Sequence, residues 1–315
     1  ASPSPEEETF PEGSLREHAG ALSREELVPG ERIAGPCLVA DDFGTLWIEK
    51  DWTACMGTRG SLLLELNESV DSSLSFPAAA RRELFSSRFL CLVEEMGAQL
   101  ERTALSVNVR ERLDFSCALL DRSGYLVANA PHIPVHLGAM GVCARHLLEL
   151  FPSLRPGDVL VSNHPAFGGS HLPDVTVLAP VFGTGDKPFC FLANRAHHAE
   201  IGGVSPGSMP AGTSSLSEEG IVISPRLLFE AGESRMDQLG ELLRSSSHPS
   251  RQPEQNLADL SAQVASLRKG IEGLDELVKA HGEDTLAEQM DALREESSAS
   301  CSRFIKEMGE CEFSA

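Results

Sequence analysis

The chain of 315 residues is long enough for two ordinary domains, and its 41% hydrophobic and 23% charged residues are typical of a globular protein, which excludes disorder of the whole chain. Asp and Glu number 47 against 26 Lys and Arg, which gives a formal net charge of −21. Because such a surface repels phosphate backbones and no concentrated basic patch offsets it, nucleic acid is excluded as a partner.

Further classes are excluded by short sequence features. No run approaches the roughly 20 apolar residues that span a membrane, so no membrane partner is expected. The acidic start of the chain, ASPSPEEETF, does not resemble a signal or transit peptide, and its lack of an initiator Met favours a processed chain or a fragment. Eight cysteines without a Cys-x-x-Cys pair favour reduced core thiols and a cytosolic location.

The first part of the chain divides into three segments. Residues 1–31 are polar and rich in Glu, Pro and Ser, so we expect them to be disordered or loosely ordered. Residues 32–66 contain short apolar runs separated by tight-turn sequences, which is typical of three or four β-strands. So small a piece buries too little surface to be stable alone, and must pack on something else. Residues 67–82 are expected to be a linker.

Residues 83–315 are expected to form one domain. Apolar residues at steps of three and four predict a helix over about 78–106, and a hairpin is expected over 115–130. A second helix is expected over 138–151. Three strand-like apolar runs then follow, at 158–163, 174–182 and 188–194.

The remaining pattern completes the fold class. A loop rich in Gly, Pro and Ser over 202–216 precedes a strand-like run at 221–230. Seven apolar residues at helical spacing predict a helix over 254–281, whose stripe packs inside a bundle or serves as an assembly surface. The elements together predict a mixed α and β fold with antiparallel β-ribbons and long packing helices.

Histidines are concentrated in one part of the chain. Seven of the ten fall between residues 132 and 198, and histidine is the usual ligand of borderline metals and the usual acid–base group near neutral pH. The runs 174–182 and 188–195 are expected to pair as a hairpin about the turn at 183–187. This pairing places Asp174 opposite a position near residue 196.

Two imidazoles and a carboxylate are therefore expected to meet at one end of the ribbon. They come from His171, Asp174 and the adjacent pair His197 and His198. Two histidines and one carboxylate form an open arrangement known for catalytic zinc or iron. The sequence thus predicts a divalent metal site, and the alternative is a set of ordinary hydrogen-bonded histidines at a loop edge.

Other motifs leave alternatives open. His132 and His136 either line the site or make structural hydrogen bonds, and Pro131 and Pro134 favour a loop over a helix there. Glu219, one of two adjacent glutamates, is either solvated or a general base. Neither a GxxxxGK[ST] phosphate loop nor a GxSxG elbow is present, so no nucleotide site of that kind and no serine nucleophile are expected.

Long motifs between Leu84 and Met290 resemble those of the hydantoinase B family and, within it, of the ATP-dependent 5-oxoprolinases. In the family's order they include LVANAPHIPVHLGAM, PGDVLVSNHPAFGGSHLPDVTVLAPVF, NRAHHAEIGG and SPGSMPAG. Residues 32–66 look like the C-terminal β piece of a hydantoinase A module, which precedes hydantoinase B in one polypeptide in 5-oxoprolinases. The resemblance implies that 83–315 are the N-terminal part of a hydantoinase B-like domain.

The resemblance also implies a reaction and residue roles. The reaction is ATP-dependent opening of a cyclic amide, 5-oxo-L-proline, to L-glutamate, a step of glutathione metabolism. Carried over by position, His171, Asp174 and His197 are ligands of a divalent metal such as Zn, Mn or Mg. We take His198 and Glu219 as the catalytic candidates, and the resemblance implies that ATP–Mg binds to a module absent from this chain.

Departures from the family pattern leave alternatives open. Glu200 stands where the family usually has Asp, and the sequence lacks the ATP-binding part of hydantoinase A and roughly the last half of hydantoinase B. Those missing portions are the expected partners, in a complete enzyme that is a homo-oligomer, and the chain alone is expected to be inactive. The alternatives are a truncated non-catalytic fragment that binds a partner chain, and a component of a related hydantoinase or ketone carboxylase.

Overall fold

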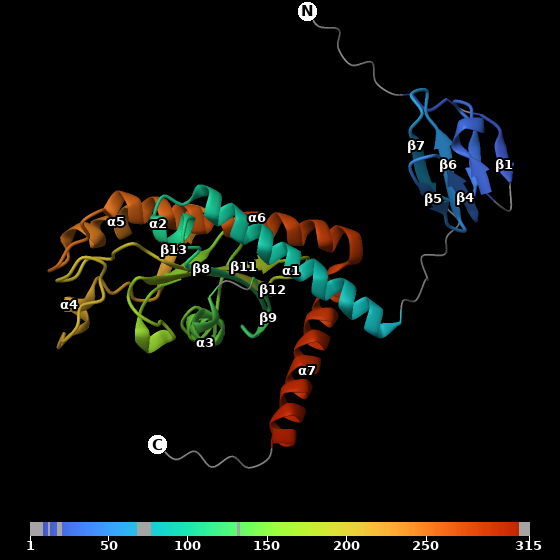
Figure 1. Cartoon of the computed structure of the whole chain (residues 1–315). Helices are drawn as coiled ribbons and strands as arrows, with labels where there is room; N and C mark the ends of the chain where they lie inside the picture. The colour runs from blue at the N-terminus through green and yellow to red at the C-terminus, as the bar shows by residue number, and fades with distance from the viewer. Residues whose placement is uncertain (1–8, 12, 18–20, 68–76, 131–132, 309–315) are drawn as a thin grey trace, which may run out of the picture. The chain divides into compact units, whose positions relative to one another are not determined.

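The computed structural model describes residues 9–11, 13–17, 21–67, 77–130 and 133–308 (Figure 1). The chain divides into two compact units, Ala1–Phe76 and Pro77–Ala315, which we call unit 1 and unit 2. Within the described residues, no helix combines the length and the apolar character needed to cross a membrane.

Unit 1 consists of short strands in two small sheets. Its elements are β1 (Leu15–Glu17), β2 (Ala21–Ser23), the 3-10 turn η1 (Arg24–Glu26), β3 (Arg32–Ala34), β4 (Cys37–Ala40), β5 (Thr45–Ile48), β6 (Trp52–Met56) and β7 (Leu62–Leu66). The sheet orders are β1-β3-β6-β7 and β2-β4-β5. Strands β1 and β2 pair in parallel with β3 and β4, and Leu22 of β2 belongs to the core of this unit.

Unit 2 is centred on a seven-stranded antiparallel sheet with the order β14-β13-β10-β11-β12-β8-β9. Its strands are β8 (Phe115–Asp121), β9 (Leu126–Asn129), β10 (Val159–Ser162), β11 (Asp174–Phe182), β12 (Pro188–His197), β13 (Arg226–Glu230) and β14 (Glu233–Ser234). Strands β8, β11 and β12 are buried along nearly their whole length, which explains their almost continuous apolar runs. The predicted mixed α and β class with antiparallel ribbons is confirmed.

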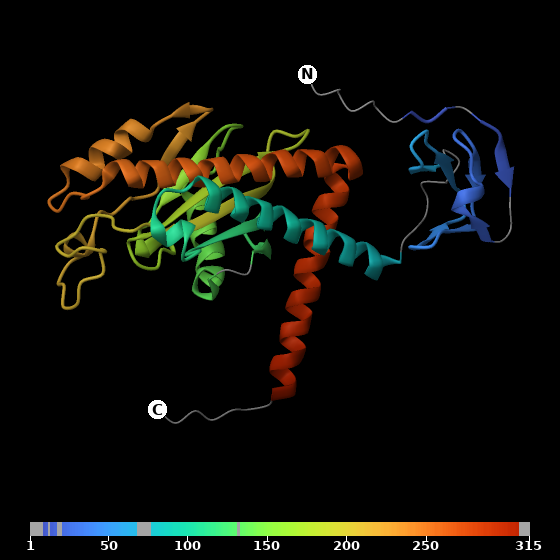
Figure 2. The same cartoon turned by 45° about the horizontal axis from the view of Figure 1, so that its top comes forward.

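Helices cover both faces of this sheet (Figure 1, Figure 2). The helical elements are α1 (Ala78–Thr103), α2 (Val107–Arg110), α3 (Pro134–Leu150), the 3-10 turn η2 (Pro165–Phe167), α4 (Leu216–Glu219), α5 (Met236–Ser245), α6 (Pro253–His281) and α7 (Glu283–Met308). Helices α1 and α6 pack together on one face, and α3 packs on the other. Along β12, Leu192 joins the α1–α6 core while Phe191 and Ala193 join the α3 core, as the two-residue period of a strand requires.

Two helix predictions are corrected by the structure. The apolar stripe of α6 is internal, because Leu260, Leu267 and Leu274 are at most 1% exposed and belong to the core shared with α1 and the sheet. The prediction of an assembly surface on this stripe is therefore wrong. Helix α3 begins at Pro134, where a loop was expected, because proline is tolerated in the first turn of a helix.

Candidate metal centre

Strands β11 and β12 form the predicted hairpin and carry the site at the end away from its turn. Asp174 begins β11 and faces His197, the last residue of β12, as a direct antiparallel partner. The carboxylate of Asp174 is fully buried, with its Oδ1 3.1 Å from His197 Nδ1 and its Oδ2 2.9 Å from His171 Nδ1. One possible ligand atom from each residue lies within 4.8 Å of the others, so the predicted convergence is confirmed.

The nitrogen and oxygen atoms of this group are arranged more like the ligands of a metal ion than like a hydrogen-bonded cluster. His171 Nδ1 and Asp174 Oδ2 are only 2.9 Å apart, yet both are buried atoms that make no hydrogen bond within the described residues. Such a pair is satisfied when its lone pairs converge on one cation. Two imidazole nitrogens and one carboxylate oxygen are ligands that zinc and other borderline divalent ions accept, with positions left open for a substrate.

Electrostatics keep the carboxylate of this group ionised. Burial alone would raise the pKa of Asp174, but its contacts with His136, His171 and His197 outweigh burial and hold the pKa well below the usual range. The same contact with Asp174 raises the pKa of His171, against a smaller lowering by burial. A metal ion and a proton therefore compete for the His171 nitrogen.

A third histidine reaches Asp174 from helix α3. His136 Nε2 lies 3.3 Å from Asp174 Oδ2, and on its other side His136 Nδ1 lies 3.0 Å from Ser116 Oγ of β8. The two possibilities left open for His136 therefore both stand, because it contacts Asp174 and also makes a hydrogen bond within the fold. His132, its counterpart in the sequence, lies outside the described residues.

The two catalytic candidates occupy different surroundings. His198, directly after β12, is fully buried, with Nδ1 3.0 Å from Asn256 Oδ1 and Nε2 3.1 Å from Gln263 Oε1, both on α6. Glu219 is half-buried at the end of α4 and accepts a hydrogen bond from Thr213 Oγ1 at 3.1 Å. In the described part of the chain, neither side chain makes a hydrogen bond or ion pair to the three metal-site residues.

A buried arginine supports the loop that leads to His171, and sequence reasoning missed it. Arg195 is fully buried and donates hydrogen bonds to Thr176 Oγ1 at 2.8 Å, Ser170 Oγ at 3.0 Å and the carbonyl of Gly168 at 2.8 Å. No described carboxylate lies within ion-pair distance of its guanidinium. The available signal was a charged residue inside the apolar run of β12, which indicates an internal polar contact.

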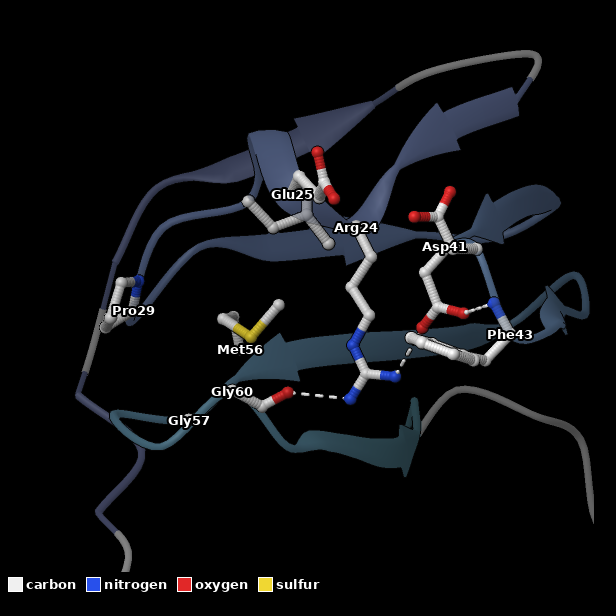
Figure 3. A pocket seen from close by; sticks show the side chains of 10 residues that line it. Arg24, Glu25, Pro29, Asp41, Phe43, Met56, Gly57 and Gly60 are labelled. Atoms are coloured by element: carbon white, nitrogen blue, oxygen red, sulfur yellow. Dashed lines mark hydrogen bonds and ion pairs between the residues drawn. The ribbon is translucent and has the colours of Figure 1, made fainter.

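Unit 1 contains a separate cavity of about 380 Å³ (Figure 3). Its wall includes Arg24, which bonds Asp41 at 3.0 Å and the carbonyl of Gly60 at 2.8 Å, and Phe43, which is almost wholly exposed. No histidine lines this cavity among the described residues, and an exposed ion pair of this kind contributes little energy. The concentration of ligating and titratable groups therefore lies in unit 2.

The comparisons with known proteins agree with this placement. The sequence profile of the family described as Hydantoinase B/oxoprolinase matches residues 79–315, so the chain belongs to that family. It is 40% identical over 278 residues to 5-oxoprolinase 1 of Arabidopsis thaliana, covering 84% of this chain and 22% of that protein. It is 38% identical over 299 residues to 5-oxoprolinase of Saccharomyces cerevisiae, covering 91% and 23%. The 5-oxoprolinase of Dictyostelium discoideum is 38% identical over 263 residues, covering 82% and 20%.

Solved structures show the same fold. ATP-dependent caprolactamase from Pseudomonas jessenii superposes with a TM-score of 0.62 at 26% identity, over 70% of this chain and 37% of that one. Acetone carboxylase in its nucleotide-free form superposes with a TM-score of 0.60 at 20% identity, over 68% and 28%, which indicates a shared fold alone. The chain spans about a fifth of the length of the curated 5-oxoprolinases that it matches.

Proposed function

We propose that this chain is the metal-site portion of an ATP-dependent cyclic amide hydrolase that opens 5-oxo-L-proline to L-glutamate. The observation that carries the proposal is the buried group of His171, Asp174 and His197, in a chain similar to proteins named 5-oxoprolinase. A divalent ion such as Zn, Mn or Mg held there would act as a Lewis acid toward a carbonyl oxygen. ATP–Mg is bound, in this proposal, by a part of the enzyme outside this chain.

The side chains of the group have distinct tasks in this proposal. Asp174 supplies the negative charge, and its full burial keeps that charge from being screened by solvent. His171 is the open side of the site, because its side chain is 38% exposed whereas that of His197 is 12% exposed. The cyclic amide is expected to approach from the His171 side.

His198 and Glu219 take supporting and reactive roles in the proposal. His198 anchors the end of β12 to α6 through both ring nitrogens and so holds the neighbouring His197 in place. Glu219 is the proposed general base. Its support is the packing of α4 near the metal-site loop: a Cβ on Gly220 would lie 3.4 Å from Leu172, the residue after His171.

Metal content of the purified chain tests the site. We expect close to one divalent ion per chain by elemental analysis and a large loss in His171→Ala, since a lost ligand should weaken binding by more than the roughly 10–100-fold typical of residues behind the ligands. His281→Ala, at the far end of α6, is the matched control and should retain the ion. Equal metal content in wild type and His171→Ala would refute the assignment.

The reaction is tested in the complete enzyme that contains this portion. We expect 5-oxoproline-dependent phosphate release from ATP, abolished by His171→Ala, and none from the isolated chain, because phosphorylating a lactam needs positioned positive charge and a Mg²⁺ site. Release from the isolated chain would mean that it carries an ATP site. Turnover of hydantoin or acetone instead of 5-oxoproline would favour the hydantoinase or ketone carboxylase alternative. Inactive complete enzyme with all three substrates would favour a non-catalytic, partner-binding role.

A further inference from the structure

The polar group behind Asp174 includes two residues without a role in the proposed chemistry, Ser116 and His136. We propose that His136, held by Ser116, is a positioning residue that orients the Asp174 carboxylate for metal binding. This inference rests on the proposed metal site. It assigns a task to residues on β8 and α3, whereas the ligands themselves lie on the β11–β12 hairpin and the loop before it.

The hydrogen bond between Ser116 and His136 bears on which nitrogen of the ring carries its proton. Ser116 Oγ carries a proton and His136 Nδ1 can accept it at 3.0 Å, which leaves the ring proton on Nε2. Nε2 lies 3.3 Å from Asp174 Oδ2. The serine thus selects the imidazole tautomer that faces the carboxylate with a donor, and a carboxylate with a fixed donor keeps its ligand oxygen in one orientation.

Burial explains why Ser116 and His136 position a ligand and do not perform chemistry themselves. Ser116 and Asp174 are 0% exposed and His136 is 1% exposed. A serine, a histidine and an aspartate in line resemble a nucleophilic triad, but a fully buried hydroxyl cannot reach a substrate carbonyl. Solvent cannot replace His136 either, so removing it takes away the polar contact that the buried carboxylate makes toward α3.

His136 is also distinct from the metal ligands. The atoms of His171, Asp174 and His197 that lie mutually within 4.8 Å form the ligand group among the described residues, and His136 is outside it. His136 instead contacts one oxygen of Asp174, on the side toward α3. A residue in this place changes how tightly an ion is held, and leaves the number and type of ligands unchanged.

The test measures Co²⁺ affinity of the purified chain by chelator competition, with the visible spectrum of the bound Co²⁺ recorded alongside. His136→Leu, which removes the donor, should weaken Co²⁺ binding by about 10–100-fold. His136→Gln, whose amide N–H₂ reaches about the position of Nε2, should recover most of the affinity, and Ser116→Ala should fall between the two. The Co²⁺ spectrum should keep its shape throughout, because the three ligands remain.

A matched control and the contrary outcomes complete the design. His146→Leu changes a half-buried histidine of the same helix that makes no hydrogen bond or ion pair to Asp174 within the described chain, and should bind Co²⁺ like the wild type. Unchanged affinity in a folded His136→Leu protein would overturn the positioning role. Failure of His136→Gln to rescue, with an altered spectrum, would overturn it by making His136 a ligand. A wild-type chain that binds no Co²⁺ would instead refute the metal site on which the inference rests.

Discussion

Truncation of Leu267 in the middle of α6 tests whether the long helix is internal core. Leu267 is 1% exposed and packs in the cluster that joins α1, α6 and the sheet. One turn before it, Val264 is buried in the same cluster, and one turn after it a Cβ on Gly270 would lie 2.6 Å from Met96 of α1. The site is too tightly enclosed to collapse around a smaller side chain.

The expected loss of stability in Leu267→Ala follows from this enclosure. Burying a leucine side chain contributes about 1.5–3 kcal/mol, and the unfilled space raises the total for Leu→Ala to about 3–5 kcal/mol. With a urea dependence of about 3 kcal/mol per molar, Leu267→Ala should lower the unfolding midpoint by about 1 M or more. Leu267→Asp adds an unpaired buried charge and should prevent unit 2 from folding. Leu150→Asp, at a half-exposed leucine of α3, is the matched control with little effect.

The two units can be followed separately in one urea titration. Both tryptophans of the chain, Trp47 and Trp52, lie in unit 1, whereas every α-helix among the described residues lies in unit 2. Helical circular dichroism at 222 nm should therefore shift in Leu267→Ala while tryptophan fluorescence keeps its wild-type midpoint. A folded Leu267→Asp protein with an unshifted helical transition would refute the assignment of this stripe to the core and restore the assembly surface.

Arg195→Lys retains the charge, but a lysine cannot reach all three hydrogen-bond acceptors of Arg195. The substitution should destabilise unit 2 by at least about 2 kcal/mol in urea titrations. It should also weaken Co²⁺ binding, because the loop before His171 loosens. An unchanged Co²⁺ affinity would show that the loop is held without it. Burial alone would raise the pKa of Glu200, but hydrogen bonds from Ser250 Oγ and the Gly202 N–H lower it below the ordinary value of 4.5. A depressed folded-state pKa adds stability above the unfolded value that is lost as pH falls through the folded pKa. The wild-type urea midpoint should thus fall more steeply below about pH 4.5 than that of Glu200→Gln, and parallel profiles would contradict this reasoning.

Much of the metal centre could be predicted because it is built on local pairing. The runs 174–182 and 188–194 are separated by a short turn, and a hairpin with a short turn has few registers. The predicted partner of Asp174, near residue 196, differs from the observed partner His197 by one position. Whichever of these registers formed, the segment at His171 would meet the histidine pair.

The sequence by itself could not decide which faces and elements the same residues meet. Strand periodicity predicts that the adjacent residues His197 and His198 point to opposite sides. Only the packing of the helices decides that His198 faces α6. The contact of His136 with Asp174 requires α3 to lie against the sheet. The apolar stripe on α6 predicts that this helix packs against another element, but it does not predict that the element is α1. These contacts join residues far apart in the chain, where no local periodicity fixes the partner, so only the tertiary structure decides them.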